Sequence, residues 1–197
     1  MLCYTVHMST GYRSTIQRFA KLAQMGEVLF HAGDLANLWK IENKNTLHTT
    51  LKRYSKKKLL FRIYKGFYSL KPINEIDPWL LGIKALHQFA YISTETVLAK
   101  EGIIQQNIAS VTMISAQSRK FNINKTSYQS RKLSDKYLFN TAGIKINCNG
   151  IRVATTERSV ADLLYFNPNY YFDAQELIDW KKVQNIQKEI GYKINNK

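Results

Sequence analysis

Cysteine and long apolar runs are both scarce in this 197-residue sequence. The two cysteines, Cys3 and Cys148, are too few for a zinc cage and too far apart in the chain to suggest a redox pair, so we expect free thiols in a reducing compartment. The longest apolar runs, such as residues 79–83, fall far short of the roughly 18 residues needed to cross a bilayer. Residues 1–7 lack the charged and apolar regions of a secretion signal. The sequence therefore predicts a cytoplasmic protein with no membrane contact.

Acidic residues are also few, 14 against 29 Lys and Arg, which argues against phosphoryl-transfer chemistry. A nuclease or nucleotidyltransferase needs closely set carboxylates to hold magnesium. Glu176 and Asp179 are spaced i, i+3, but a solvated helix face explains them better, and Glu157 fits the dipole at a helix N-terminus. No phosphate-binding glycine loop, nucleophile elbow or Cys/His dyad is visible. No metal-binding pair exists among the four histidines, His7, His31, His48 and His87. We expect no enzyme activity, no metal and no cofactor.

The net charge of +15 is concentrated in the first part of the chain. Residues 1–74 hold 13 Lys and Arg against 3 Asp and Glu, whereas residues 75–197 hold 16 against 11. Such a balance favours a polyanionic partner: DNA, RNA or an anionic membrane face.

Residues 14–57 have the pattern of three short helices. The first is expected over residues 14–24, and the second over residues 34–39 after a short strand at 28–30. A third should run from Thr46 to about Lys57, capped by Asn45. The first helix is expected to bury Ile16, Phe19, Ala20 and Ala23.

The third helix carries the strongest functional signal. Leu47, Leu51 and Tyr54 lie at i, i+4 and i+7 and form one core stripe. The remaining side chains are expected to face outward: Thr46, His48, Thr49, Thr50, Lys52, Arg53, Lys56 and Lys57. Short donors near the start of a helix and cations toward its end suit a helix that enters the DNA major groove.

Two short strands, at residues 59–64 and 67–70, should form a hairpin in which Gly66 supplies a positive φ. Together with the three helices, this hairpin predicts a winged helix-turn-helix domain over residues 14–72, after a flexible extension at 1–13. Cationic helix faces are also common on proteins that touch no nucleic acid, and winged helices also bind proteins. The expected DNA contacts are Lys44, Asn45, Thr46, His48, Thr49, Lys52, Arg53, Lys56, Arg62 and Lys65.

A polar connector at residues 72–78 separates a second domain, residues 79–197. Helices are expected at 79–89, at 94–100 with Ser93 as cap, from Thr155 or Thr156 to Tyr165, and at 174–190. Strand-like runs lie at 111–114, 120–123, 127–131, 144–146 and 151–154, the last two joined by an Asn149-Gly150 turn. The predicted fold class is α+β: the winged helix-turn-helix, then a mixed α/β domain with a small, mainly antiparallel sheet and flanking helices.

Basic residues in the second domain allow two interpretations. Five of them are candidates for contact with an acidic partner or a second nucleic-acid segment: Arg119, Lys120, Arg131, Lys132 and Arg152. Ordinary solubilising charge is the alternative. Arg158, by contrast, is expected to be a buried anchor paired with Asp162 at i, i+4.

Several segments resemble the AbiEi antitoxins of bacterial abortive-infection systems. They are Asn45–Leu47, Leu51–Tyr54, Tyr64–Tyr68, Tyr91–Leu98 with Gly102–Ile104, Val111–Thr112 and Val153–Leu164. The resemblance covers about residues 14–168 and weakens beyond Pro168. It implies an antitoxin and transcriptional autorepressor that binds repeats in its own promoter and opposes a nucleotidyltransferase-like toxin. The family is called type IV, so a stable complex with the toxin is not required.

Two other hypotheses remain open at this point. One is a protein-interaction module that neutralises a partner by direct contact, with a purely structural winged helix. The other is an enzyme of nucleic-acid metabolism with an unrecognised site.

Overall fold

The computed structural model describes residues 10–106 and 108–194, which divide into two compact units. The N-terminal unit is Met1–Glu75 and the C-terminal unit is Ile76–Lys197, so the boundary lies inside the polar segment 72–78. The flexible extension expected over residues 1–13 was too long, because Thr10–Arg13 already belong to the first helix. Residues 1–9 lie outside the described part of the chain.

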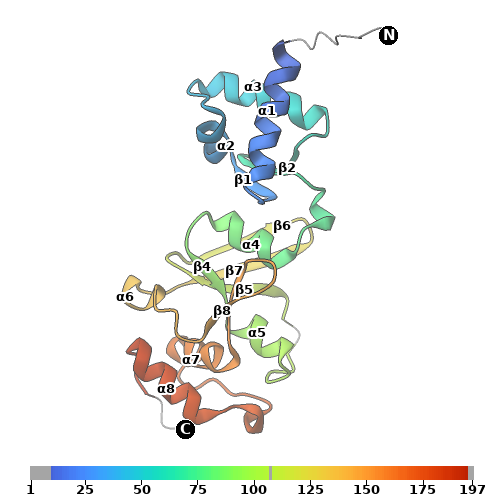
Figure 1. Cartoon of the computed structure of the whole chain (residues 1–197). Coiled ribbons are helices and arrows are strands. Elements are labelled where there is room, and N and C mark those ends of the chain that lie inside the picture. The colour runs from blue at the N-terminus through green and yellow to red at the C-terminus, as the bar shows by residue number, and fades with distance from the viewer. Residues whose placement is uncertain (1–9, 107, 195–197) are drawn as a thin grey trace, which may run out of the picture. The chain divides into compact units, whose positions relative to one another are not determined.

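Three helices and a three-stranded antiparallel sheet make up the N-terminal unit (Figure 1). In chain order the elements are α1 (Thr10–Gln24), β1 (Leu29–His31), α2 (Ala32–Trp39), α3 (Lys44–Lys56), β2 (Phe61–Tyr64), β3 (Phe67–Ser69) and the short 3-10 helix η1 (Ile73–Glu75). The strand order is β1-β3-β2. All three predicted helices and both hairpin strands are present in the predicted places.

The core of this unit shows which side of α1 faces inward. Leu22 is fully buried, and the Phe19 ring packs edge-on against Tyr54, with 5.2 Å between the ring centroids. The expected inward position of Ile16 is wrong, since its side chain is 46% exposed, and Ala20 and Ala23 are exposed too. The bulkier Phe19 and Leu22 set the buried face because they remove more apolar area from water than alanines do.

The β2–β3 hairpin turns at Lys65-Gly66, where Gly66 has the expected positive φ of 86°. The register shifts between the Arg62↔Tyr68 and Tyr64↔Phe67 pairs, which is a bulge in β2. β1 pairs with the other side of β3 and completes the sheet.

The C-terminal unit contains a six-stranded sheet with strand order β6-β7-β5-β4-β9-β8 (Figure 1). Its strands are β4 (Ala90–Ile92), β5 (Ser110–Ser115), β6 (Arg119–Ile123), β7 (Thr126–Lys132), β8 (Ile144–Ile146) and β9 (Arg152–Ala154). Its helices are α4 (Pro78–Leu86), α5 (Glu95–Lys100), α6 (Asp135–Leu138), α7 (Thr156–Phe166), the 3-10 helix η2 (Gln175–Leu177) and α8 (Trp180–Ile190).

The sheet is larger and more mixed than the small, mainly antiparallel one expected. All five strand-like runs are strands, and β4 adds a sixth. The β5–β7 and β4–β9 pairs are parallel, and the other three pairs are antiparallel. Residue alternation identifies a strand but not its distant neighbours, so the two crossover pairings were not visible in the sequence.

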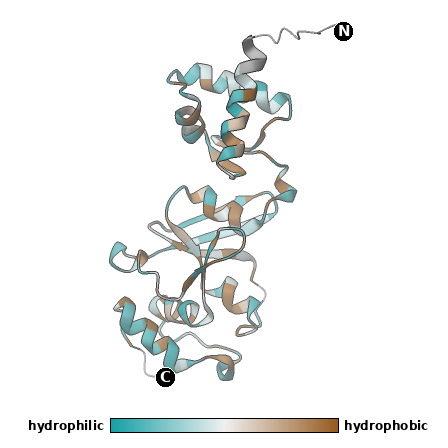
Figure 2. Cartoon of the chain, viewed as in Figure 1, coloured by the Kyte–Doolittle hydropathy of each residue, from teal (hydrophilic) through white to brown (hydrophobic). Residues whose placement is uncertain are grey.

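Helices cover the two faces of this sheet (Figure 1). On one face α4 packs so closely that a Cβ on Gly82 would lie 2.5 Å from the ring of Tyr128. On the other face, Tyr91 and Ile114 share one core with residues of α7 and α8, including Leu164 and Val183. Figure 2 shows the apolar residues of α4 and the hydrophilic residues along α8.

Three helix details differ from the sequence expectation. Thr94, with φ 57°, precedes α5 in the capping position assigned to Ser93. The last helix begins at Trp180 rather than near residue 174, because Asp179 caps it by accepting from the Lys182 amide at 3.0 Å. The four-residue α6 was not predicted. Among the helices of residues 10–194 described here, none is long and apolar enough to cross a membrane.

Candidate nucleic-acid interface and a buried polar cluster

Helix α3 begins two residues earlier than expected because Asn43, not Asn45, is its cap. The Asn43 Oδ1 atom accepts hydrogen bonds from the backbone N–H groups of Asn45, at 2.9 Å, and Thr46, at 3.1 Å. This satisfies two of the amides that every helix start leaves unpaired. Lys44 and Asn45 thus lie in the first turn of the helix.

The outer face of α3 is polar and solvent-exposed, and much of it has the hydrophilic colour in Figure 2. Leu47, Leu51 and Tyr54 are buried as expected. Thr50 is buried as well, so its expected outward position is wrong. All ten side chains proposed as DNA contacts are exposed: Lys44, Asn45, Thr46, His48, Thr49, Lys52, Arg53 and Lys56 on α3, Arg62 on β2 and Lys65 in the turn after it.

Only some of the charges along α3 stabilise the helix itself, namely Arg53 and Lys56 in the last turn, where the helix dipole favours cations. The helix carries Lys44, Lys52, Arg53 and Lys56 and no acidic residue. Lys44 lies in the first turn, where the helix dipole disfavours a cation, and Lys52 and Lys56 are a like-charge i, i+4 pair. Both arrangements destabilise the isolated protein. When a polyanion is bound to this face, the same charges become stabilising, because they then lie beside negative charge.

Tyr54 holds α3 against α1. Its Oη atom accepts a hydrogen bond from Arg18 Nη1 at 3.2 Å and lies 3.3 Å from Thr15 Oγ1. The Arg53 guanidinium lies 5.3 Å from the centre of the Tyr54 ring, within cation–π range. Burial acts to raise the pKa of Tyr54, but the hydrogen bonds from Thr15 and Arg18 and the charge of Arg18 outweigh it, and the pKa is lowered.

A groove of about 630 Å³ runs between α2 and α3. Ala36, Ile41 and Leu47 contribute its apolar lining, and Lys44 and His48 of α3 line it as well. Two of the exposed α3 side chains therefore border a concave surface.

The five basic residues proposed for a partner in the C-terminal unit are spread over the sheet. Arg119 and Lys120 lie on β6 and Arg131 and Lys132 on β7, whereas Arg152 lies on β9, beyond β5 and β4. The Lys120↔Gln129 and Arg119↔Ser130 pairs place Lys120 with Arg131 on one face and Arg119 with Lys132 on the other. These five side chains do not form one continuous patch.

All three arginines of this set already have partners, and the Arg119 guanidinium lies 5.1 Å from the centre of the Phe121 ring. Arg131 forms an ion pair with Glu95 of α5. The Arg152 guanidinium lies over the Phe89 ring, 4.9 Å from its centre.

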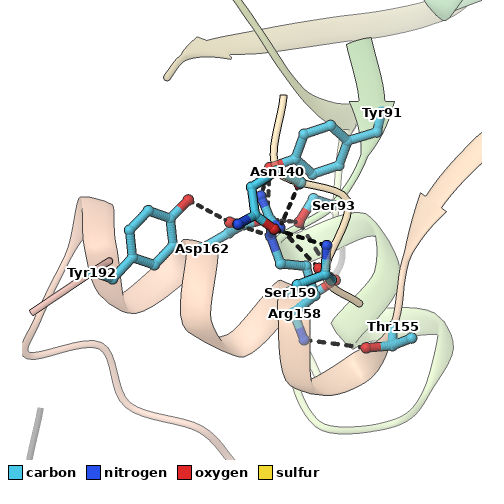
Figure 3. Close-up of polar contacts among 9 residues, drawn as sticks. Tyr91, Ser93, Asn140, Thr155, Arg158, Ser159, Asp162 and Tyr192 are labelled. Atoms are coloured by element: carbon cyan, nitrogen blue, oxygen red, sulfur yellow. Dashed lines mark hydrogen bonds and ion pairs between the residues drawn. The ribbon is translucent and has the colours of Figure 1, made fainter. Parts of the chain in front are cut away.

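Arg158 is the buried anchor that the sequence predicted (Figure 3). Its Nε donates to Asp162 Oδ1 at 2.9 Å, and neither side chain has exposed surface. Its Nη1 donates to the carbonyl oxygens of Asn140, at 3.0 Å, and Ala142, at 2.9 Å. Its Nη2 donates to the Tyr91 hydroxyl at 2.7 Å.

Asp162 receives four donors in the same cluster (Figure 3). Besides Arg158, the hydroxyls of Ser93, Tyr91 and Tyr192 donate to its carboxylate at 2.8, 3.1 and 2.8 Å. Complete burial raises the pKa of Asp162, while Arg158 and the Ser93 and Tyr192 hydroxyls act to lower it. Because every contact is donated to the oxygens, the arrangement suits the ionised carboxylate. Burial and the nearby Asp162 charge raise the pKa of both Tyr91 and Tyr192.

This cluster ties distant segments together and is closed to solvent. It joins β4, α7, the loop at Asn140–Ala142 and Tyr192 beyond α8. Gly143 packs against it, since a Cβ there would lie 2.7 Å from the Arg158 Cβ. The pairing of Arg158 with Asp162 was foreseeable from the i, i+4 spacing, but the contribution of Tyr192 was not, because nothing in the sequence links it to residue 162.

Other chemistry is sparse in the part of the chain that the structure describes. No group of three or more His, Cys, Asp and Glu side chains that could hold a metal ion occurs there. Cys148 is exposed in the β8–β9 turn and forms no disulfide, and Cys3 lies outside the described residues.

Comparison with known proteins yields a likeness of fold. No family model matches the chain, and no curated protein matches it. A solved structure, that of the RV2827C protein from Mycobacterium tuberculosis, is similar with a TM-score of 0.52 and 9% sequence identity. The match covers 89% of this chain and 71% of that one, so the likeness of fold extends over most of this chain.

Proposed function

We propose that the N-terminal unit is a winged helix-turn-helix that binds double-stranded DNA, with α3 as the recognition helix and the β2–β3 hairpin as the wing. The protein would act as a transcriptional autorepressor and antitoxin of the AbiEi type, without catalysis of its own. The observation that carries the DNA-binding part is the exposed, acid-free cationic face of α3.

The side chains on α3 suit two different tasks. Thr46, His48 and Thr49, in the first half of the helix, carry hydrogen-bonding groups of the length that reaches base edges. Lys52, Arg53 and Lys56, in the second half, carry charges that suit phosphates. A two-residue turn with an exposed Lys65 gives the hairpin a further phosphate or minor-groove contact.

The test is a salt titration of binding to the DNA just upstream of the gene. With about six phosphate contacts, affinity should fall roughly a thousandfold between about 50 and about 200 mM salt. The K52A/K56A variant should weaken binding to all sequences and lower the slope of log K against log salt by about 2.

A matched control removes two exposed lysines from the C-terminal unit, K181A/K188A, with the same change in net charge. If both variants lose affinity equally, net charge and not α3 governs binding, and the recognition helix is wrongly assigned. If the wild-type protein shows no preference for the upstream DNA, the repressor proposal fails, and the result favours the protein-interaction module instead.

The antitoxin part of the proposal has separate support and a separate test. It depends on the resemblance over Asn45–Leu47, Leu51–Tyr54, Tyr91–Leu98 and Val153–Leu164, which includes core residues of α3 and the Arg158–Asp162 cluster. A nucleotidyltransferase-like reading frame beside this gene would be its expected target. Co-expression with that product should relieve growth arrest, and K52A/K56A should abolish repression while leaving the relief of growth arrest intact.

A further inference from the structure

β8 is an edge strand whose outer backbone groups are available for pairing. It ends the strand order of the sheet, next to β9. The Thr155 N–H donates to the Gly143 carbonyl at 2.7 Å and the Asn147 N–H to the Ile151 carbonyl at 2.9 Å. Because hydrogen-bonded and non-hydrogen-bonded pairs alternate along an antiparallel ladder, Ile144 and Ile146 direct their backbone groups away from β9. The Ile144 N–H bonds to Thr141, which leaves the Ile146 N–H and the two carbonyls toward the open edge.

One face of this edge carries exposed apolar and cationic side chains in a continuous line. Ile146, whose side chain is 69% exposed, is the cross-strand partner of Arg152. Arg152 lies over Phe89, and the Phe89 ring centre is 5.2 Å from that of Phe139, which is 58% exposed. Exposed isoleucine, phenylalanine and arginine in contact have the composition of a protein interface centre rather than of ordinary surface.

The other face of the same edge contains a pocket of about 470 Å³. Lys145 of β8 and its cross-strand partner Val153 line it, together with Trp79 of α4 and with Lys100, Glu101 and Glu157. The Lys100 ammonium lies 5.2 Å from the centre of the Trp79 ring. A side chain of an added strand that faced Lys145 would lie at the mouth of this pocket.

We propose that β8 is a docking strand for an extended segment of a protein partner, with an acidic side chain opposite Lys145 and an apolar one opposite Ile146. Addition of a strand to an open sheet edge takes its affinity from main-chain hydrogen bonds and its specificity from the alternating side chains. Lys145, directly opposite on the edge strand, selects the acid, and the line from Ile146 to Phe139 selects the apolar residue. The C-terminal unit, with 16 Lys and Arg against 10 Asp and Glu, favours an acidic partner at longer range.

A second copy of the chain is a poor occupant of the same edge. In the symmetric antiparallel register that joins the outward groups of Ile144 and Ile146, Lys145 of one copy would lie opposite Lys145 of the other. Like charges directly opposite one another destabilise a strand pair. Self-association through β8 is therefore disfavoured at neutral pH.

The experiment is selection of a random-heptamer phage library on the full-length protein, followed by NMR mapping of the enriched peptides. We expect enriched sequences that alternate apolar residues with Asp or Glu and that shift the amide signals of residues 144–146 and the Trp79 indole. R152E should weaken binding of an enriched peptide about tenfold, since it puts a negative charge one strand away from the acidic segment and into the line that receives its apolar residue. Enrichment of basic or non-alternating sequences, or shifts that avoid β8, would overturn the proposal.

The chain supplies a matched control for charge reversal. Arg119 lies on the other edge strand, β6, and its guanidinium also lies over a phenylalanine, 5.1 Å from the ring of Phe121. The peptide affinity of R119E should stay within about twofold of the wild-type affinity, well short of the tenfold loss expected for R152E.

A backbone variant tests the pairing itself. Ile146→Pro removes an N–H that faces the open edge and not the β9 ladder, so it should abolish peptide binding while Ile146→Thr keeps most of it. Equal losses in R119E and R152E, or unchanged binding in Ile146→Pro with a folded spectrum, would refute strand addition at β8. DNA affinity should be unchanged in all these variants, so failure here is distinct from failure of the DNA-binding proposal.

Discussion

A guanidinium without exposed surface is tolerated only where its donors meet acceptors, and Arg158 fulfils this condition at every nitrogen. We expect Arg158→Met to destabilise the C-terminal unit by about 3–5 kcal/mol, because it leaves the Asp162 charge and two carbonyls without their partner. Urea denaturation measures this difference. The control Arg152→Met changes an exposed arginine and should cost less than about 0.5 kcal/mol. A loss below about 1 kcal/mol for Arg158→Met would show that the cluster is replaceable.

Tyr192 in the same cluster gives stability a defined dependence on alkaline pH. Its pKa and that of Tyr91 are raised above the ordinary value of 10.0, so both hydroxyls keep their protons in the folded state. Below pH 10 this stabilisation is fully present. Above it the unfolded chain releases these protons and the folded chain does not, so the free energy of unfolding falls as the pH rises.

Each such tyrosine contributes a slope of about 1.4 kcal/mol per pH unit above pH 10. Tyr192→Phe should lower stability by about 1 kcal/mol at pH 7, where only the lost hydrogen bond counts. The same variant should show a shallower alkaline slope, so the two stability curves converge near pH 11. Guanidinium denaturation at a series of pH values checks this, and parallel curves for wild type and variant would contradict it.

At the scale of elements, α3 places two adjacent threonines in different environments. Thr49 is exposed and Thr50 is buried at 6% exposure. Replacement of either by valine removes a hydroxyl and keeps the shape of the side chain. Thr49→Val should reduce discrimination between the upstream site and a site with one changed base pair by about 1–3 kcal/mol, whereas Thr50→Val should not. Binding to a panel of single-substitution sites measures this, and equal effects would mean that Thr49 does not face DNA.

The position of α3 could be predicted because its signals are local. Leu47, Leu51 and Tyr54 repeat with the helical period, and Asn-rich turn residues precede them. The exact cap was missed because Asn43 and Asn45 both suit it, and only the backbone geometry selects Asn43. Thr50 was misplaced because the apolar stripe is wider than three residues, and its neighbours at i−3 and i+4, Leu47 and Tyr54, are buried with it.

Which strands pair in the sheet could not be predicted in the same way, because strand pairing depends on contacts between residues that are distant in the sequence. The Asn149-Gly150 turn predicted the β8–β9 hairpin, because its signal is local. The parallel pairing of Ile92 with Val153 joins residues about sixty positions apart, and residue alternation holds no information about it. The docking edge at β8 could not be predicted for the same reason, since an edge is defined by the whole strand order. The five basic residues proposed to bind a partner were grouped by charge alone. In the strand order, those on β6 and β7 are separated from Arg152 on β9 by β5 and β4.

At the scale of the whole molecule, each unit has its own apolar core. Leu51, in α3, belongs to the core of the N-terminal unit, and Leu163, in α7, belongs to that of the C-terminal unit; their exposures are 0% and 1%. Calorimetry of the full chain should therefore show two unfolding transitions, because each compact unit with its own core can unfold as a separate cooperative unit.

Leu51→Ala and Leu163→Ala are a matched pair of cavity-forming substitutions that separate the two transitions. Each should cost about 2–5 kcal/mol and lower the midpoint of one transition by on the order of 10 °C, while the other transition stays in place. Upstream DNA added to the calorimeter sample should raise the midpoint temperature of only the transition that Leu51→Ala lowers, because a ligand stabilises the unit that binds it. Leu163→Ala should keep wild-type DNA affinity at a temperature between the two midpoints. A single transition lowered by both substitutions would mean that the units fold as one, and DNA binding would then depend on the C-terminal core as much as on α3.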